Sequence, residues 1–136
     1  SKIEALQPIL QSRKEPYILT GDFNALSPED SYDRDRLSEE LSAFISKNPS
    51  LSIDDLLKRQ LITWILSHNL RDAFEDKKRR GSTVPTRIKY GKEVNGMRID
   101  YFFISNDIKV NDAYVLKNED TEMASDHYPI VGIFDV

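Results

Sequence analysis

The sequence contains no cysteine, and none of its apolar runs approaches the roughly 20 residues that a membrane-spanning helix needs. Without cysteine, a disulfide framework, a thiolate nucleophile and a cysteine-based zinc site are excluded. The net charge of -4 excludes a general basic field, so any contact with nucleic acid must be local. The N-terminus lacks the order of a signal peptide, which favours a cytoplasmic location unless a segment upstream of Ser1 carries such a signal.

What is present suffices for one domain. The 136 residues are 39% hydrophobic, which is enough for a single core. Apolar residues recur at helical spacing over residues 2–13, and Pro16 ends this predicted helix. The compact apolar run Tyr17–Thr20 then predicts a buried strand that stops at Gly21.

Two further helices are predicted after a polar loop at residues 27–36. The first has one apolar stripe, formed by Leu37, Leu41, Phe44 and Ile45. The second begins after Ser52, a good N-cap residue, and runs to about His68. Its stripe comprises Ile53, Leu56, Leu57, Leu61, Trp64 and Ile65.

The rest of the chain is predicted to be mostly strands and loops. Residues 75–96 form a long surface loop with a short extended piece at Thr86–Tyr90, and 117–126 is a polar connection. The predicted strands are Leu70–Phe74, Arg98–Ile104, Val110–Leu116 and Tyr128–Phe134. Because the helices form a crossover connection, we expect an α+β fold with one mixed sheet and helices on one face. The other face is left without cover and needs a partner layer.

Three Asp, an Asn and a His occur in three distant segments, Gly21–Asn24, Arg98–Tyr101 and Ser125–Pro129, where each segment meets or lies within a predicted strand. In an extended segment Asp22 and Asn24 project to one side, while Phe23 points the other way. A carboxylate beside an amide suits a water nucleophile, because the carboxylate accepts its proton and the amide orients it. The alternative is a simple turn, since these residue types are turn formers.

Asp100 lies inside a strand among large apolar residues. A buried carboxylate costs several kcal/mol unless it is paired, so Asp100 needs a cationic or donor partner. Arg98, two residues away on the same face, would make a purely structural pair. His127 would make a functional one, because its ring needs an acceptor that sets its orientation and favours the imidazolium form. The sequence leaves both partners open.

Asp126 and His127 are neighbours and therefore diverge, which suits two tasks. Asp126 would face a divalent metal, since hard cations such as Mg²⁺ prefer carboxylate oxygens, and His127 would face the charged phosphate. A capping or surface pair is the alternative interpretation.

Other polar residues have less specific interpretations. Thr83, Thr86 and Arg87 are candidates for lining a substrate groove, or else belong to a polar loop. The run Lys77–Arg80 is typical of a solvated surface. His68 lies at the C-terminus of a predicted helix, where its charge complements the helix dipole, and we assign it no catalytic role.

Together the three segments resemble the endonuclease/exonuclease/phosphatase superfamily, which includes deoxyribonuclease I, apurinic endonucleases, sphingomyelinases and inositol-phosphate phosphatases. The resemblance runs from about residue 17 to residue 134 and implies hydrolysis of a phosphodiester or phosphomonoester by activated water, with Mg²⁺ or Mn²⁺. It also implies a role for each candidate residue. Asp22 would be the base and a metal ligand, Asn24 would position the water and bind substrate, and Asp126 would be a metal ligand. His127 would contact the phosphate, Asp100 would orient His127, and Arg87 would contact substrate. Leu70–Phe74 matches a structural segment of the family, and Thr83–Thr86 its substrate-side loop.

The departures from the family are equally specific. Its fold is a four-layer sandwich of two halves, and the first half supplies a metal-binding Glu, an Asn and a second His, none of which is present here. Residues 1–136 therefore resemble the C-terminal half, with a helical insertion at about 27–67. We expect this chain to be inactive alone, with its main metal ligand in the missing N-terminal half.

Partners follow from the same resemblance. A phosphate ester is the expected substrate, and nucleic acid is one candidate, because residues 75–98 hold a local group of basic side chains despite the acidic total. A non-catalytic assembly module or pseudoenzyme is the alternative function. In it, the apolar sheet face pairs with a second copy and buries Phe102 or Phe103 in a homodimer.

Overall fold

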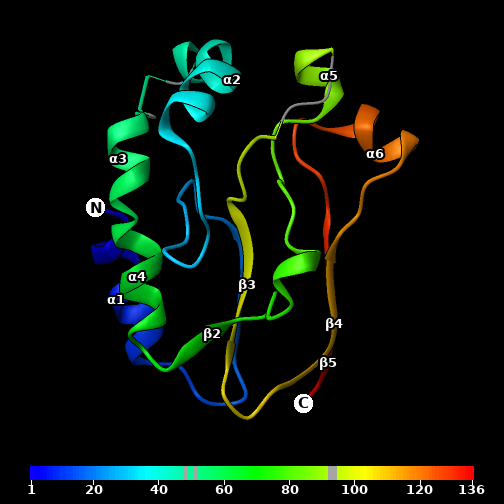
Figure 1. The fold of residues 1–136 in the computed structure, drawn as a ribbon. Helices are drawn as coiled ribbons and strands as arrows, with labels where there is room; N and C mark the ends of the chain where they lie inside the picture. The colour runs from blue at the N-terminus through cyan, green and yellow to red at the C-terminus, as the bar shows by residue number, and fades with distance from the viewer. Residues whose placement is uncertain (48, 51, 92–94) are drawn as a thin grey trace.

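The computed structural model describes residues 1–47, 49–50, 52–91 and 95–136 (Figure 1). Lys92 of the predicted basic loop lies outside the described residues, as do the side chains of Ala43, Phe44, Lys77, Lys89 and Tyr90. The helices are α1 Lys2–Gln11, α2 Arg34–Ser46, α3 Ile53–Lys58, α4 Gln60–Leu66, α5 Arg87–Tyr90, α6 Glu119–Ala124 and the short 3-10 helix Lys77–Arg79. The strands are β1 Ile18–Asp22, β2 Leu70–Asp72, β3 Asp100–Ser105, β4 Lys109–Val115 and β5 Ile130–Asp135.

The strands form two antiparallel sheets, one of order β1-β3-β2 and one of the pair β4-β5. The α+β prediction is confirmed, but the prediction of one mixed sheet is wrong. Every described ladder is antiparallel, and β3 lies between β1 and β2, so both of its edges are occupied. β4 cannot pair with β3 and forms its own sheet with β5.

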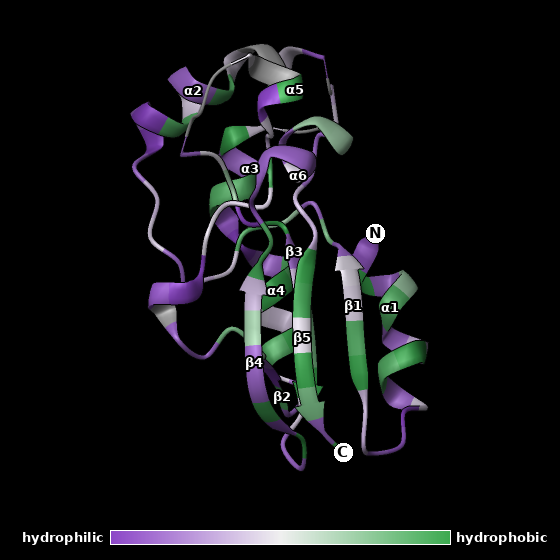
Figure 2. Ribbon diagram, turned by 90° about the vertical axis from the view of Figure 1, so that its right-hand side faces the viewer, coloured by the Kyte–Doolittle hydropathy of each residue, from purple (hydrophilic) through white to green (hydrophobic). Residues whose placement is uncertain are grey.

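One face of the β1-β3-β2 sheet packs against helices, as predicted (Figure 1). Leu19, Tyr101 and Phe103 lie on this face together with Leu70, and they contact apolar residues of α1 and α4. The prediction that β1 is buried is wrong, because β1 is an edge strand and presents its other face to solvent (Figure 2). Ile18, for example, is 39% exposed.

The second face of this sheet is partly covered by β4-β5, which we did not predict. The Phe102 ring packs edge-on against Phe134, with ring centres 5.5 Å apart, and Ile104 is fully buried beside them. Phe103 is also fully buried, but under the helices. The prediction that Phe103 enters a dimer interface is therefore wrong, whereas for half-buried Phe102 it stays a prediction.

The predicted long helix after Ser52 is in fact two helices. Ser52 caps α3 as expected, since its hydroxyl accepts a hydrogen bond from the backbone N–H of Asp55 at 3.0 Å. Arg59 then adopts a left-handed conformation with φ of 56° and separates α3 from α4. Its guanidinium donates to the carbonyl oxygens of Ser27 and Asp30, so contacts with a distant loop stabilise the break.

Part of the segment between β2 and β3 is buried, although we predicted a surface loop. Residues 83–86 are buried, because Val84 forms a β-bridge with Met97 and this part of the chain lies inside the fold. The predicted extended piece at Thr86–Tyr90 is wrong, since α5 occupies most of it. The polar connection 117–126 contains α6, which we also did not predict. Among the described residues, no helix has the length and hydrophobicity required to cross a bilayer.

Candidate active site

The register between β1 and β3 places two carboxylates side by side. Asp22 lies directly opposite Asp100 in this ladder, and the turn before β5 carries His127 to the same place. Nδ1 of His127 lies 2.9 Å from Oδ2 of Asp100, and Nε2 lies 3.8 Å from Oδ2 of Asp22. The structure therefore brings one side chain from each of the three segments into a single cluster.

The electrostatics of this cluster favour a charged histidine. The hydrogen bond to Asp100 raises the pKa of His127, and the negative charges of Asp100, Asp22 and Asp126 act in the same direction. Partial burial of the ring opposes this rise. The ring is therefore predisposed to be a cation that is oriented on one side and accessible on the other, which suits contact with an anion.

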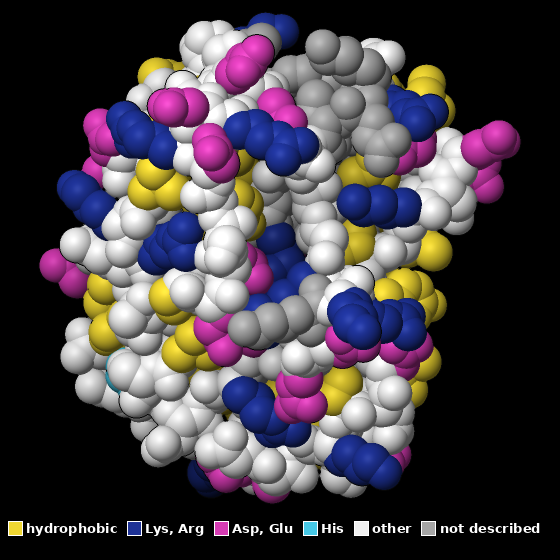
Figure 3. Space-filling model, in the orientation of Figure 1, with side chains coloured by type: hydrophobic (Ala, Val, Ile, Leu, Met, Phe, Trp, Pro, Cys, Tyr) yellow, Lys and Arg dark blue, Asp and Glu magenta, His cyan; other side chains and the backbone are white. Residues whose placement is uncertain are grey.

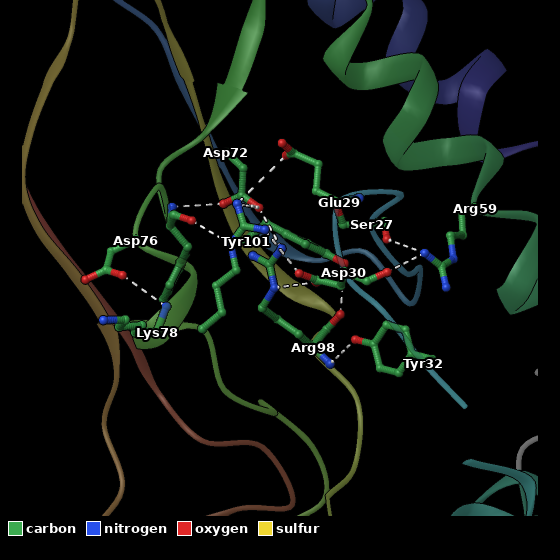
Figure 4. A network of polar contacts seen from close by, with 12 residues as sticks. Ser27, Glu29, Asp30, Tyr32, Arg59, Asp72, Asp76, Lys78, Arg98 and Tyr101 are labelled. Atoms are coloured by element: carbon green, nitrogen blue, oxygen red, sulfur yellow. Dashed lines mark hydrogen bonds and ion pairs between the residues drawn. The ribbon is translucent and has the colours of Figure 1, made fainter. Parts of the chain in front are cut away.

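Arg98 is not the partner of Asp100, so the structural-pair alternative is wrong. Arg98 is 3% exposed and pairs with Asp72 at 2.7 Å and with Asp30 at 2.8 Å (Figure 4). Its guanidinium also lies 4.7 Å from the centre of the Tyr101 ring. Although burial lowers it, these two carboxylates raise the pKa of Arg98 above its ordinary value. β3 begins at Asp100, two positions after Arg98, so the alternation of side chains between the two faces of a strand does not extend to Arg98.

The segment Gly21–Asn24 contains the turn that we considered as an alternative. Oδ1 of Asp22 accepts a hydrogen bond from the backbone N–H of Asn24 at 2.8 Å, and Asn24 has a φ of 46°. The extended backbone thus ends at Phe23. Asp22 and Asn24 both line one open pocket of about 340 Å³ between β1 and α1, where Nζ of Lys2 donates to the carbonyl of Phe23 and which neither Asp100 nor His127 lines. The turn and a site at Asp22 are compatible.

Asp126 is less closely associated with the cluster. Its side chain is half-buried and accepts a hydrogen bond from the Ser125 hydroxyl at 3.4 Å. The group of possible metal-binding side chains that the described residues form consists of Asp22, Asp100 and His127, whose ligand atoms lie within 4.8 Å of one another. Metal binding by Asp126 therefore stays a prediction.

Within that group, the most suitable donor for a hard cation is the exposed carboxylate of Asp22. Oδ2 of Asp100 is already hydrogen-bonded to His127, and the raised pKa of His127 favours binding of a proton to the ring over binding of a metal. Mg²⁺ is commonly bound through one or two protein carboxylates, with waters as its other ligands. Asp22 and one neighbouring carboxylate could supply the protein ligands.

Thr83 and Thr86 are fully buried, so the prediction that they line a substrate groove is wrong. Arg87 is exposed at the start of α5, where its backbone N–H donates to Glu122 at 3.0 Å. Its contact with substrate stays a prediction.

A nuclease would be expected to show a continuous basic track along residues 75–98, but acidic partners interrupt the basic side chains that the structure describes there. Arg98 is buried and the Arg80 side chain is 9% exposed, and both pair with Asp30, while Arg79 pairs with Asp112 at 3.2 Å. On the face shown in Figure 3, Lys and Arg side chains alternate with Asp and Glu. These described cations therefore stabilise the fold, and they do not form a continuous surface for a phosphate backbone.

Two acidic residues that matter for this arrangement were missed by our sequence analysis. Asp72 and Asp30 neutralise Arg98, and Asp72 also accepts a hydrogen bond from the backbone N–H of Phe74. A signal for Asp72 was present, since it lies in a predicted strand next to apolar residues, as Asp100 does. The same rule about buried carboxylates would have indicated that it needs a cation.

The sequence model of the endonuclease/exonuclease/phosphatase family matches residues 2–127. The chain therefore belongs to this family, whose members are hydrolases that act on phosphate esters. The match includes Asp22, Asn24, Asp100, Asp126 and His127. No curated protein and no solved structure matches the chain significantly.

Proposed function

We propose that this chain contributes the base and the phosphate-binding histidine of a metal-dependent phosphoesterase. The observation that supports the proposal most strongly is the geometry of His127. Nδ1 of the ring is hydrogen-bonded to Asp100 at 2.9 Å, and Nε2 lies 3.8 Å from the exposed carboxylate of Asp22. A cation and a general base are thus adjacent at the surface, as hydrolysis of an anionic ester by water requires.

Each residue has a distinct task in this proposal. Asp100 sets the orientation of the imidazolium, so that Nε2–H of His127 is available to donate to a phosphoryl oxygen and to stabilise the charge that develops there. Asp22 accepts the proton of the attacking water. Its Oδ1 is held by the backbone N–H of Asn24, which leaves Oδ2 on the side of the histidine.

Mg²⁺ or Mn²⁺ would be held by Asp22 and Asp126. When bound, such an ion polarises the phosphoryl oxygens as a Lewis acid. Because the cluster among the described residues offers so few carboxylates, we propose that a further carboxylate from the N-terminal half of the family fold is the main ligand. The 136-residue chain alone should then hydrolyse phosphate esters slowly or not at all.

The experiment is a hydrolysis assay on a protein that contains this chain together with the N-terminal half. Bis-p-nitrophenyl phosphate, p-nitrophenyl phosphate and a DNA oligonucleotide, each with Mg²⁺ or Mn²⁺, would separate diesterase, monoesterase and nuclease activities. We expect Asp22→Asn and His127→Gln each to lower the rate by about 10²–10⁴-fold, the size typical of acid–base groups. Near-normal turnover by either variant would refute the assignment.

Matched controls are available in the chain. Asp135→Asn makes the same change at an exposed carboxylate at the end of β5, and His68→Gln replaces the other histidine, which contacts the carbonyl of Trp64. Both controls should retain the parent rate. Activity of the 136-residue chain by itself would refute the need for a further ligand.

A further inference from the structure

Thr83 connects the two parts of the chain that carry Asp100 and His127. Its hydroxyl oxygen accepts a hydrogen bond from the backbone N–H of Ile99 at 3.0 Å, next to Asp100. Its carbonyl oxygen accepts from the backbone N–H of Tyr128 at 2.8 Å, next to His127. Thr83 is fully buried, so water cannot readily replace either bond.

Thr86 makes hydrogen bonds to the other end of the turn that carries His127, residues 125–128. Its backbone N–H donates to the carbonyl of Asp126 at 3.1 Å, and its hydroxyl donates to the carbonyl of Ser125. Thr86 is also fully buried. Three hydrogen bonds thus connect the turn 125–128 to the segment 83–86, while the backbone N–H groups of Thr83 and Val84 both reach the carbonyl of Met97.

We propose that Thr83 and Thr86 are positioning residues that hold the His127 turn against the start of β3, and so set the hydrogen bond between His127 and Asp100. The inference rests on the proposed function, because it assigns both threonines a task in the same site. Neither threonine touches substrate, since both are enclosed by the fold.

The two hydrogen bonds that depend on the side chains are those made by the hydroxyl groups. A backbone bond survives a change of side chain, but valine cannot accept the bond from Ile99 or donate to Ser125. Valine has nearly the shape of threonine and leaves a buried polar group without a partner, whereas serine keeps the hydroxyl and loses only a methyl group. The Val and Ser variants therefore separate the hydrogen bond from the packing.

The readout is the ring of His127 in the 136-residue chain, followed by nuclear magnetic resonance at a fixed, mildly acidic pH. A proton on Nδ1 that is bonded to Asp100 should resonate downfield and exchange slowly. We expect Thr83→Val and Thr86→Val to shift this signal upfield or to broaden it beyond detection. Thr83→Ser and Thr86→Ser should retain it. His68, the other histidine, should keep its signals in all four variants, which gives an internal control.

Three results would overturn the proposal. The first is an unchanged His127 signal in folded Thr83→Val and Thr86→Val, and if one of these does not fold, the other decides. The second is loss of the signal in the Ser variants as well. The third is simultaneous loss of the His68 signals in both Val variants, which would show a general role in the core. Because no turnover is measured, a failure of the proposed hydrolysis would leave this result interpretable by itself.

Discussion

Removing the buried charge of Arg98 should destabilise the chain severely. Arg98→Met keeps a flexible apolar side chain but removes the guanidinium that lies over the Tyr101 ring, and it leaves Asp72 without its partner at 2.7 Å. The Asp72 side chain is 1% exposed, and Arg80 remains only at 4.0 Å. Breaking a buried ion pair on one side costs about 3–5 kcal/mol. Since a domain of this size is stable by about 5–15 kcal/mol, this loss is a large fraction of the total.

Urea unfolding followed by fluorescence measures this loss directly. Trp64 is the single tryptophan of the chain and is partly buried against the main core, so its emission reports on folding. Arg34→Met is the matched control, because Arg34 forms an ion pair with Asp54 in which both side chains are more than half exposed. Exposed pairs of this kind contribute less than about 1 kcal/mol. The slope of the transition should be similar in all variants if unfolding is two-state.

A double variant tests the physical cause. In Arg98→Met with Asp72→Asn, the amide oxygen can still accept the bond from the Phe74 N–H, but the unpaired charge is gone. The double variant should therefore be more stable than Arg98→Met alone. The reasoning is refuted if the free energy of unfolding of Arg98→Met lies within about 1 kcal/mol of the parent value, as is expected of the Arg34→Met control. It is also refuted if the double variant recovers no stability.

Three further predictions concern the site and the core. The pKa of His127 is raised in the folded chain, so protonated His127 adds stability that is fully present below the unfolded pKa and is lost as pH rises through the folded pKa. Asp100→Asn should weaken this decline, which urea unfolding at several pH values would show, and an unchanged decline would contradict it. Gly96→Ala should cost more than about 1–3 kcal/mol in thermal unfolding, because Gly96 has a φ of 62° and an added Cβ would lie 2.2 Å from a carbonyl oxygen. Phe103→Ala should cost about 3–5 kcal/mol in the same assay and clearly more than Phe102→Ala, since only Phe103 is fully buried; equal losses would contradict the assignment of faces.

Local sequence signals predicted the elements that depend on local contacts. The apolar spacing of residues 2–13 corresponds to α1, and the capping role of Ser52 is confirmed by its bond to Asp55. The apolar stripe beginning at Leu37 corresponds to α2. Such features are readable because a helix and its cap are stabilised by residues only three or four positions apart.

The candidate site was only partly readable in the same way. Asp22, Asp100 and His127 stood out because they lie within predicted apolar strands or where such strands begin or end, and the structure brings these three together. The burial of Thr83 and Thr86 was not readable, because their sequence surroundings are polar and their partners lie at least 14 positions away.

Thus the sequence by itself determined the family, and with it the class of chemistry, and it named candidate side chains for the site, since the three short segments carry the family resemblance. Tertiary structure alone decided which partners those side chains have. Arg98 could have paired with Asp100 by spacing, but it pairs with Asp72 and Asp30, and this leaves Asp100 for His127. The physical reason is that a buried charge selects its partner by three-dimensional proximity, which depends on how strands and loops pack together.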